Sequence, residues 1–227
     1  VMRLRRTLLW VPGNKWNMIN EAIESEADCI VMDLEDLVHP KEKSTDREMV
    51  AKALSELDFK KKEKIVRINP INTELGEEDI IVVVPFNPDA IRLPKCETTE
   101  YVLIQDDQLS FYEEMYGFAK NSIDIILMIE SALGVRNAYE LASCTERVTA
   151  IGLGAEDLTA NLRTKRTTSG LQLELLYARQ KLIIDGRAAG VDVIDSSCLV
   201  VNEPEDLKKF VTHCRSPFGP SRRRSSG

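Results

Sequence analysis

Short apolar runs alternate with longer amphipathic stretches along most of this chain. The apolar runs are predicted to be strands at residues 7–11, 29–34, 64–68, 90–93, 123–129, 148–153 and 191–194. The amphipathic stretches repeat apolar residues three and four positions apart and are predicted to be helices at residues 14–26, 44–57, 100–116, 135–143, 171–189 and 203–214. Asn14 is a candidate N-cap for the first helix.

This order of strands and helices indicates parallel strands that are buried on both faces. Seven such units predict a TIM (β/α)8-type barrel over residues 1–215, in which the eighth strand is missing or truncated. Residues 216–227 are polar, basic and without periodicity, so they are predicted to be a disordered or non-native tail. The stretch 79–85 stays open: its β-branched residues favour a strand, and a helix with one buried face also fits.

Composition narrows the possible functions. The 227 residues carry a net charge of −7, which disfavours nucleic acid as a partner. Two histidines are too few for a His-rich zinc site, and the five cysteines include no C-x-x-C pair. We therefore expect reduced thiols and a cytoplasmic location. No apolar segment reaches membrane-spanning length, so no membrane association is expected.

Polar side chains follow one predicted strand after another. They include Asp33, Glu35 and Asp36; Arg67 and Asn69; Lys95; Glu130 and Ser131; Glu156 and Asp157; and Asp195 and Ser196. The carboxyl ends of barrel strands converge on one mouth, where active sites are found. Each charge there costs desolvation unless it is paired or bound to a ligand. A single member could be a helix cap or a salt bridge, and Asp33 and Glu156 could be structural, but the whole set predicts a ligand site.

The chemistry of this set favours a hard cation. Glu130 and Asp157 offer carboxylate oxygens on neighbouring strands, which suit Mg²⁺ that keeps water or substrate in its remaining positions. A guanidinium such as that of Arg67 can bind a carboxylate or stabilise an enolate oxygen. No G-x-G-x-x-G or Walker A motif is present, which disfavours dinucleotide and ATP chemistry.

Several of these motifs, in the same order, resemble the citrate lyase β-subunit group of the HpcH/HpaI aldolase superfamily. The matching segments are residues 6–14, 27–36, 66–69, 91–95, 129–134, 154–158, 163–166 and 176–179. The resemblance implies a TIM barrel, a homo-oligomer with a trimer favoured, and Mg²⁺. It implies cleavage of citryl-CoA or citryl carrier protein to oxaloacetate and an acetyl thioester. Acyl carrier protein and transferase subunits are the implied partners, and a helix is implied for residues 79–85.

The resemblance also implies roles for single residues. Glu130 and Asp157 correspond to the metal ligands, and Arg67, Arg6 and Glu130 to substrate-binding residues. The catalytic group comprises Arg67 together with Glu35 and Asp36, which lie near the metal-bound waters and the substrate. In the expected mechanism the substrate hydroxyl is deprotonated, the carbon–carbon bond breaks, and Arg67 stabilises the thioester enolate. The general base stays unassigned.

Three other interpretations stay open. A malyl-CoA or citramalyl-CoA lyase would use the same residues. A non-catalytic subunit that binds carboxylates or CoA is favoured by the missing last strand, since the family's Gly-Phe-x-Gly-Lys-x-x-Ile-His-Pro segment does not follow Phe218-Gly219 here. A Schiff-base aldolase that uses Lys95 is the third interpretation.

Overall fold

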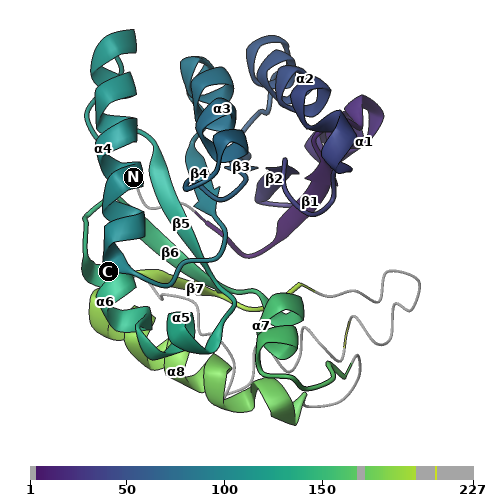
Figure 1. Ribbon diagram of the computed structural model, residues 1–227. Coiled ribbons are helices and arrows are strands. Elements are labelled where there is room, and N and C mark those ends of the chain that lie inside the picture. The colour runs from purple at the N-terminus through teal and green to yellow at the C-terminus, as the bar shows by residue number, and fades with distance from the viewer. Residues whose placement is uncertain (1–3, 168–171, 198–207, 209–227) are drawn as a thin grey trace, which may run out of the picture. The chain divides into compact units, whose positions relative to one another are not determined.

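The computed structural model describes residues 4–167, 172–197 and 208, and strands and helices alternate along them (Figure 1). The strands are β1 (Leu8–Pro12), β2 (Cys29–Asp33), β3 (Glu63–Arg67), β4 (Ala90–Leu93), β5 (Asp124–Ile129), β6 (Val148–Leu153) and β7 (Asp192–Ile194). The α-helices are α1 (Trp16–Glu24), α2 (Lys43–Glu56), α3 (Glu74–Val83), α4 (Thr99–Tyr116), α5 (Ala132–Arg136), α6 (Ala138–Ser143), α7 (Ala155–Asn161) and α8 (Leu173–Ala189). Two short 3-10 helices are η1 (Pro40–Glu42) and η2 (Val84–Phe86).

Two compact units divide the chain, and each is described by itself. The first unit holds Val1–Pro94 and Ile104–Ile125, and the second holds Lys95–Leu103 and Ile126–Gly227. Helix α4 and strand β5 contribute residues to both units. The predicted helix at 203–214, the predicted tail at 216–227 and the predicted loss of an eighth strand concern the end of the chain, which lies outside the described residues apart from residue 208.

Parallel pairing orders the strands of the first unit as β1-β2-β3-β4. Val31, at the middle of β2, pairs with Trp10 on one side and Ile65 on the other. Every residue of β2 is buried, as expected for a strand covered on both faces. The start of β5 follows β4, because the Asp124 N–H donates to the Asp89 carbonyl at 2.9 Å.

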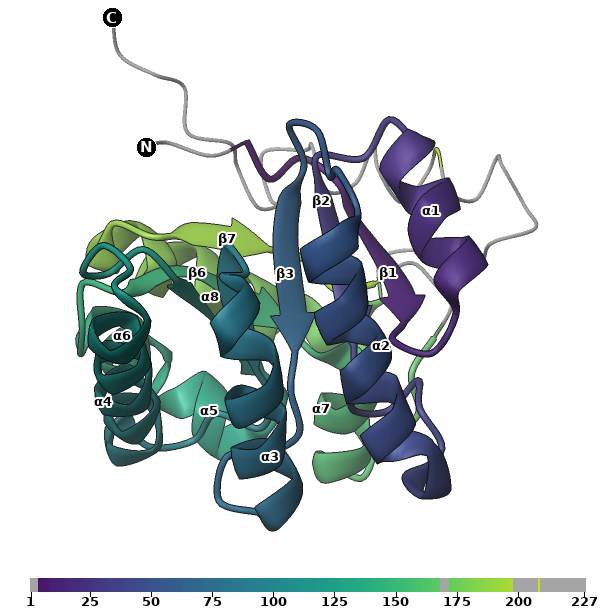
Figure 2. The same cartoon turned by 90° about the horizontal axis from the view of Figure 1, so that it is seen from above.

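Three helices, α1, α2 and α3, lie alongside β1–β4 in the first unit (Figures 1 and 2). The helix predicted at 14–26 is confirmed as α1, whose apolar residues Ile19, Ala22 and Ile23 are all buried. The stretch that was ambiguous at 79–85 is helical through Val83, within α3. The register of the first unit aligns Asp33 with Arg67 across the ends of β2 and β3.

The second unit contains the remainder of β5 followed by β6 and β7. β6 and β7 pair in parallel, with Ile151 opposite Val193. Helix α8 packs against both strands at Gly186, where an added Cβ would lie 2.4 Å from Cγ2 of Val193. Only a residue without a side chain permits this approach, so Gly186 fixes how closely the helix covers the sheet.

Local details differ from the sequence prediction at three places. The single helix expected at 135–143 is two helices, α5 and α6, that meet at Asn137. Helix α7 was not predicted because its seven residues are too few to display a helical period. Asn14 does not cap α1: the N-cap is Lys15, without a side-chain bond, and the Asn14 amide donates to Glu42 at 2.9 Å.

Cys29 and Cys96 are buried free thiols and Cys144 is a partly exposed one, in agreement with the expected reduced thiols. Cys198 and Cys214 lie outside the described residues. Among the described helices, none combines the length and the apolar character that crossing a bilayer requires.

Candidate active site

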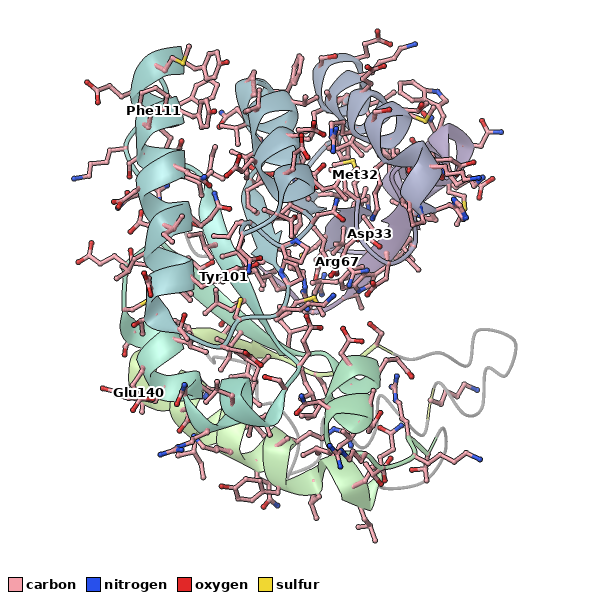
Figure 3. The ribbon with its side chains drawn as sticks, viewed as in Figure 1. Met32, Asp33, Arg67, Tyr101, Phe111 and Glu140 are labelled. Atoms are coloured by element: carbon pink, nitrogen blue, oxygen red, sulfur yellow. The ribbon has the colours of Figure 1, made fainter. Side chains whose placement is uncertain are left out.

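Arg67 is the centre of a buried charge cluster in the first unit (Figure 3). Its Nε and Nη2 donate to the two carboxylate oxygens of Asp33 at 2.5 and 2.6 Å. Its Nη1 lies 3.0 Å from Oε2 of Glu35 and 3.4 Å from Oδ2 of Asp36. The structure therefore brings together the predicted residues Arg67, Glu35 and Asp36, with Asp33 holding the arginine.

Asp33 organises this cluster because it is fully buried and accepts four hydrogen bonds. Besides the two from Arg67, it accepts from the backbone N–H groups of Glu35 at 3.0 Å and Leu37 at 2.9 Å. A buried carboxylate is tolerated only when its oxygens are paired in this way. Asp33 consequently fixes both the arginine and the turn that carries Glu35 and Asp36.

The pKa of Arg67 shows the balance of these forces. Burial of the guanidinium by itself lowers the pKa, but the hydrogen bonds to Asp33 and the negative charges of Asp33, Glu35 and Asp36 raise it further than burial lowers it. The net pKa lies above the ordinary value, so Arg67 is a permanent cation.

A second guanidinium lies next to the first on the same aromatic ring. Arg92 is the register partner of Arg67 on β4, and residues in register on neighbouring strands point to the same face. The guanidinium carbons of Arg67 and Arg92 lie 4.7 and 4.9 Å from the centre of the Trp10 ring. Trp10 therefore supports both cations through cation–π contacts.

Lys43 supports the turn after β2 through hydrogen bonds to its carbonyl groups. Its buried ammonium donates to the carbonyl oxygens of Leu34 and Glu35 at 2.6 and 2.5 Å. Burial lowers the pKa of Lys43, although nearby carboxylates, Asp33 first among them, act in the opposite direction. Asn69 also holds this turn, since its amide donates to the Leu34 carbonyl at 2.9 Å.

Arg6 lies at the other end of these strands. It precedes β1, whereas Arg67 ends β3, and its half-exposed side chain pairs with Asp28, which precedes β2. With a rise of about 3.3 Å per residue, five-residue strands separate their two ends by roughly 15 Å. Arg6 is therefore not part of the Arg67 cluster, and its role in substrate binding stays a prediction.

Glu130 follows β5 in the second unit and is anchored by the main chain. Its buried carboxylate accepts a hydrogen bond from the backbone N–H of Lys95, with a distance of 2.6 Å to Oε1. Lys95 takes a left-handed conformation with φ of 54°, which is uncommon for a residue with a side chain and frequent at functional sites.

Gly154 packs closely against the side chain of Glu130. A Cβ at position 154 would lie 2.3 Å from Oε2 of Glu130 and 2.6 Å from its Cβ, so no larger residue fits without displacing the glutamate. Gly154 is also the N-cap of α7, and Asp157 lies in the first turn of that helix. Gly154 therefore both contacts Glu130 and begins the helix that carries Asp157. The N-terminus of that helix favours negative charge.

The residues present fit a magnesium ion better than a transition metal. The described residues contain no group of three or more His, Cys, Asp or Glu side chains arranged to hold a metal. Glu130 and Asp157 offer carboxylate oxygens, the donors that Mg²⁺ prefers, and Mg²⁺ completes its shell with water and substrate oxygens. The close approach of Gly154 shows that the position of the Glu130 carboxylate is tightly constrained.

Lys95 does not meet the requirements of a Schiff-base lysine. Its side chain is exposed, whereas a nucleophilic amine is activated by desolvation in an apolar pocket or by a neighbouring cation. What Lys95 contributes in the structure is its backbone N–H. The sequence placed Lys95 correctly at a strand end but gave no sign of this main-chain role.

Comparison with known proteins adds independent information. The model of the HpcH/HpaI aldolase/citrate lyase family matches residues 6–216. The citrate lyase subunit beta of Haemophilus influenzae is 38% identical over 208 residues, which is 92% of this chain and 71% of that protein. The human mitochondrial citramalyl-CoA lyase is 31% identical over 201 residues, which is 84% of this chain and 58% of that protein.

A solved structure shares the fold. The citrate lyase beta subunit of Mycobacterium tuberculosis, in a complex with oxaloacetate and magnesium, superimposes with a TM-score of 0.72 at 23% identity, covering 89% of this chain and 83% of that one. At this identity the likeness establishes the α/β fold.

Proposed function

This chain belongs to the HpcH/HpaI aldolase/citrate lyase family, whose relatives named above are carbon–carbon lyases, and we propose that it is a magnesium-dependent lyase that cleaves a citryl thioester to oxaloacetate and an acetyl thioester. The observation that carries the proposal is the restrained position of Glu130, whose carboxylate accepts from the Lys95 N–H and lies against Gly154. Asp157 lies in the helix that Gly154 caps. The magnesium in the M. tuberculosis relative supports it.

Glu130 and Asp157 are the residues that would hold the cation. When bound, Mg²⁺ supplies positive charge that lowers the pKa of a coordinated hydroxyl and polarises a coordinated carboxylate. Glu130 is the better fixed of the two, because the Lys95 N–H and the surface of Gly154 restrain its carboxylate on two sides. A side chain whose position is already fixed loses little conformational entropy when it binds a cation.

Arg67 binds a substrate oxygen through its Nη1 edge. Asp33 occupies Nε and Nη2, so the Nη1 edge is where the guanidinium meets the exposed carboxylate of Asp36 at 3.4 Å. The Asp36 side chain is 56% exposed and its contact is the longest in the cluster, so an incoming carboxylate or enolate oxygen replaces Asp36 most easily.

The reaction requires two proton movements. The citryl hydroxyl loses a proton as its carbon becomes the ketone of oxaloacetate, and the carbon–carbon bond electrons pass to the thioester, which forms an enolate. That enolate carbon then takes a proton to become the methyl group of the acetyl thioester. We assign these movements to Glu35 and Asp36, of which Asp36 exchanges protons with water because it is the exposed one.

The wider assembly belongs to the same proposal. We expect a TIM-type barrel and a homo-oligomer, with a trimer favoured, because these are the implications of the family resemblance. Acyl carrier protein and transferase subunits are the proposed partners if the thioester is carried on protein. The cytoplasm is the proposed location, since the composition indicates reduced thiols.

A three-substrate assay tests the proposal. The chain is incubated with Mg²⁺ and citryl-CoA, citramalyl-CoA or malyl-CoA, and oxaloacetate, pyruvate or glyoxylate is measured. We expect oxaloacetate release to have the highest kcat/KM and to stop with EDTA. Faster release of pyruvate would assign citramalyl-CoA lyase activity, which the human relative makes the second candidate. Binding of oxaloacetate without turnover of any thioester would identify a non-catalytic subunit.

A further inference from the structure

Helix α4 exposes an apolar stripe on the part that belongs to the first unit. Ile104, Phe111 and Met115 are 47%, 62% and 62% exposed, although residues of this kind are usually buried. Their spacing of seven and four residues, with Gln108 between them, places all four on one side of the helix. The opposite side carries Leu109, which is fully buried. Figure 3 labels Phe111 on this part of α4.

The stripe is large enough to take part in recognition. A large side chain has on the order of 150–250 Å² of surface, so three that are about half exposed present roughly 300 Å² together. Contiguous apolar patches of about 300–600 Å² on a monomer are often functional. Anchors at i, i+7 and i+11 match the way one amphipathic helix lays its apolar face along another.

Acidic residues next to the apolar stripe indicate the charge that a partner should carry. Helix α4 contains five acidic residues and no lysine or arginine. Asp107 and Glu114 are exposed, seven residues apart, and therefore form a row that runs beside the apolar stripe. Such a row attracts a basic partner and repels an acidic one.

We propose that this face of α4 is a docking site for a basic amphipathic helix of another protein, with an apolar stripe and an adjoining row of lysine or arginine. A second copy of this chain is a poorer occupant, because pairing α4 with α4 brings two acidic helices together. The docking site is independent of lyase chemistry, so its test does not depend on turnover.

Two labelled helical peptides with the same leucine stripe provide the probe, one flanked by lysine and the other by glutamate. Fluorescence anisotropy with the whole chain should show at least tenfold tighter binding of the lysine peptide, and the binding should weaken with salt. The double substitution F111S/M115S should reduce that affinity at least tenfold. The reversal D107K/E114K should make the glutamate peptide the preferred one.

The matched control is Y177S/I184S on α8, where both residues are also exposed, at 73% and 67%. It should leave peptide affinity within twofold of the parent chain, and circular dichroism should show unchanged melting for every variant. Equal binding of the two peptides, or equal losses from the α4 and α8 substitutions, overturns the proposal. Self-association of the chain that F111S/M115S abolishes overturns it too, since a second copy then occupies the face.

Discussion

Arg67 and Asp33 form a bidentate ion pair in which both carboxylate oxygens accept from the guanidinium, at 2.5 and 2.6 Å. Their register across β2 and β3 places them opposite one another. The pair orients the remaining edge of Arg67 toward Glu35 and Asp36. Asp33 is therefore a positioning residue for Arg67.

Substitution of Asp33 tests this role. Asp33→Asn replaces one acceptor by a donor and leaves a buried guanidinium partly unpaired, so stability should fall by about 3–5 kcal/mol. The kcat/KM for citryl-CoA should fall at least 100-fold. Asp36→Asn is the matched control, and its loss of stability should stay below about 1 kcal/mol because Asp36 is exposed. Equal melting temperatures for the two variants would contradict the assignment.

Removal of either proposed metal ligand should weaken cation binding. Glu130→Gln and Asp157→Asn each remove one negative charge, and the Mg²⁺ affinity measured by titration calorimetry should drop at least tenfold. Glu156→Gln is the control, since Glu156 neighbours Asp157 on α7 and pairs with Arg166. If Glu156→Gln lowers Mg²⁺ affinity as much as Asp157→Asn, the metal ligands have been assigned wrongly.

The close approach of Gly154 to Glu130 makes a more specific prediction. Gly154→Ala forces its new methyl group against Glu130, so Mg²⁺ affinity should fall about tenfold and stability by about 1–3 kcal/mol. Adding Glu130→Asp, which shortens the carboxylate, should recover part of the stability in the double variant. A double-mutant cycle measures this coupling. Additive losses would show that the two residues do not meet.

Asp46 predicts a pH dependence of stability. Its side chain on α2 is fully buried, and burial raises its pKa above the ordinary value of 3.8, with the charge of Glu42 adding to the rise. The folded chain therefore holds this proton at pH values where the unfolded chain has lost it. Linkage then makes stability fall as pH rises from about 3.8 through the folded pKa.

Substitution of Asp46 should remove that slope. Asp46→Ala should be more stable than the parent chain at pH 7, and the difference should disappear in acid below pH 3.8. Urea denaturation at a series of pH values measures it. Asp58→Ala serves as a control at an exposed carboxylate. A variant that is less stable at pH 7 would show that ionised Asp46 stabilises the fold.

The sequence predicted the strands well because their signal is local. Each of the seven strands lies within a residue or so of its apolar run, and the burial of all of β2 follows from its unbroken hydrophobic pattern. Strand ends also identified Arg67, Glu35 and Asp36, which the structure brings together. These inferences need only the period of the chain and the rule that parallel strands end at one edge.

Other features depend on contacts that no local pattern encodes. Asp33 could be a cap, a salt bridge or an orienting group, and only its pairing with a residue 34 positions away decides. The anchor of Glu130 is a backbone N–H, which every residue type but proline carries. The motif that contains Arg6 likewise does not show that this residue precedes β1, at the end of the strands opposite to Arg67.

The hydrogen bond from the Lys95 backbone N–H to Glu130 also leaves the side chain at position 95 open to change. Because the bond comes from the peptide group, the lysine could be exchanged for other residues without releasing the glutamate, and glycine or asparagine would suit the left-handed backbone best. The exposed side chain at this position could then be redesigned while the proposed metal ligand Glu130 stays in place.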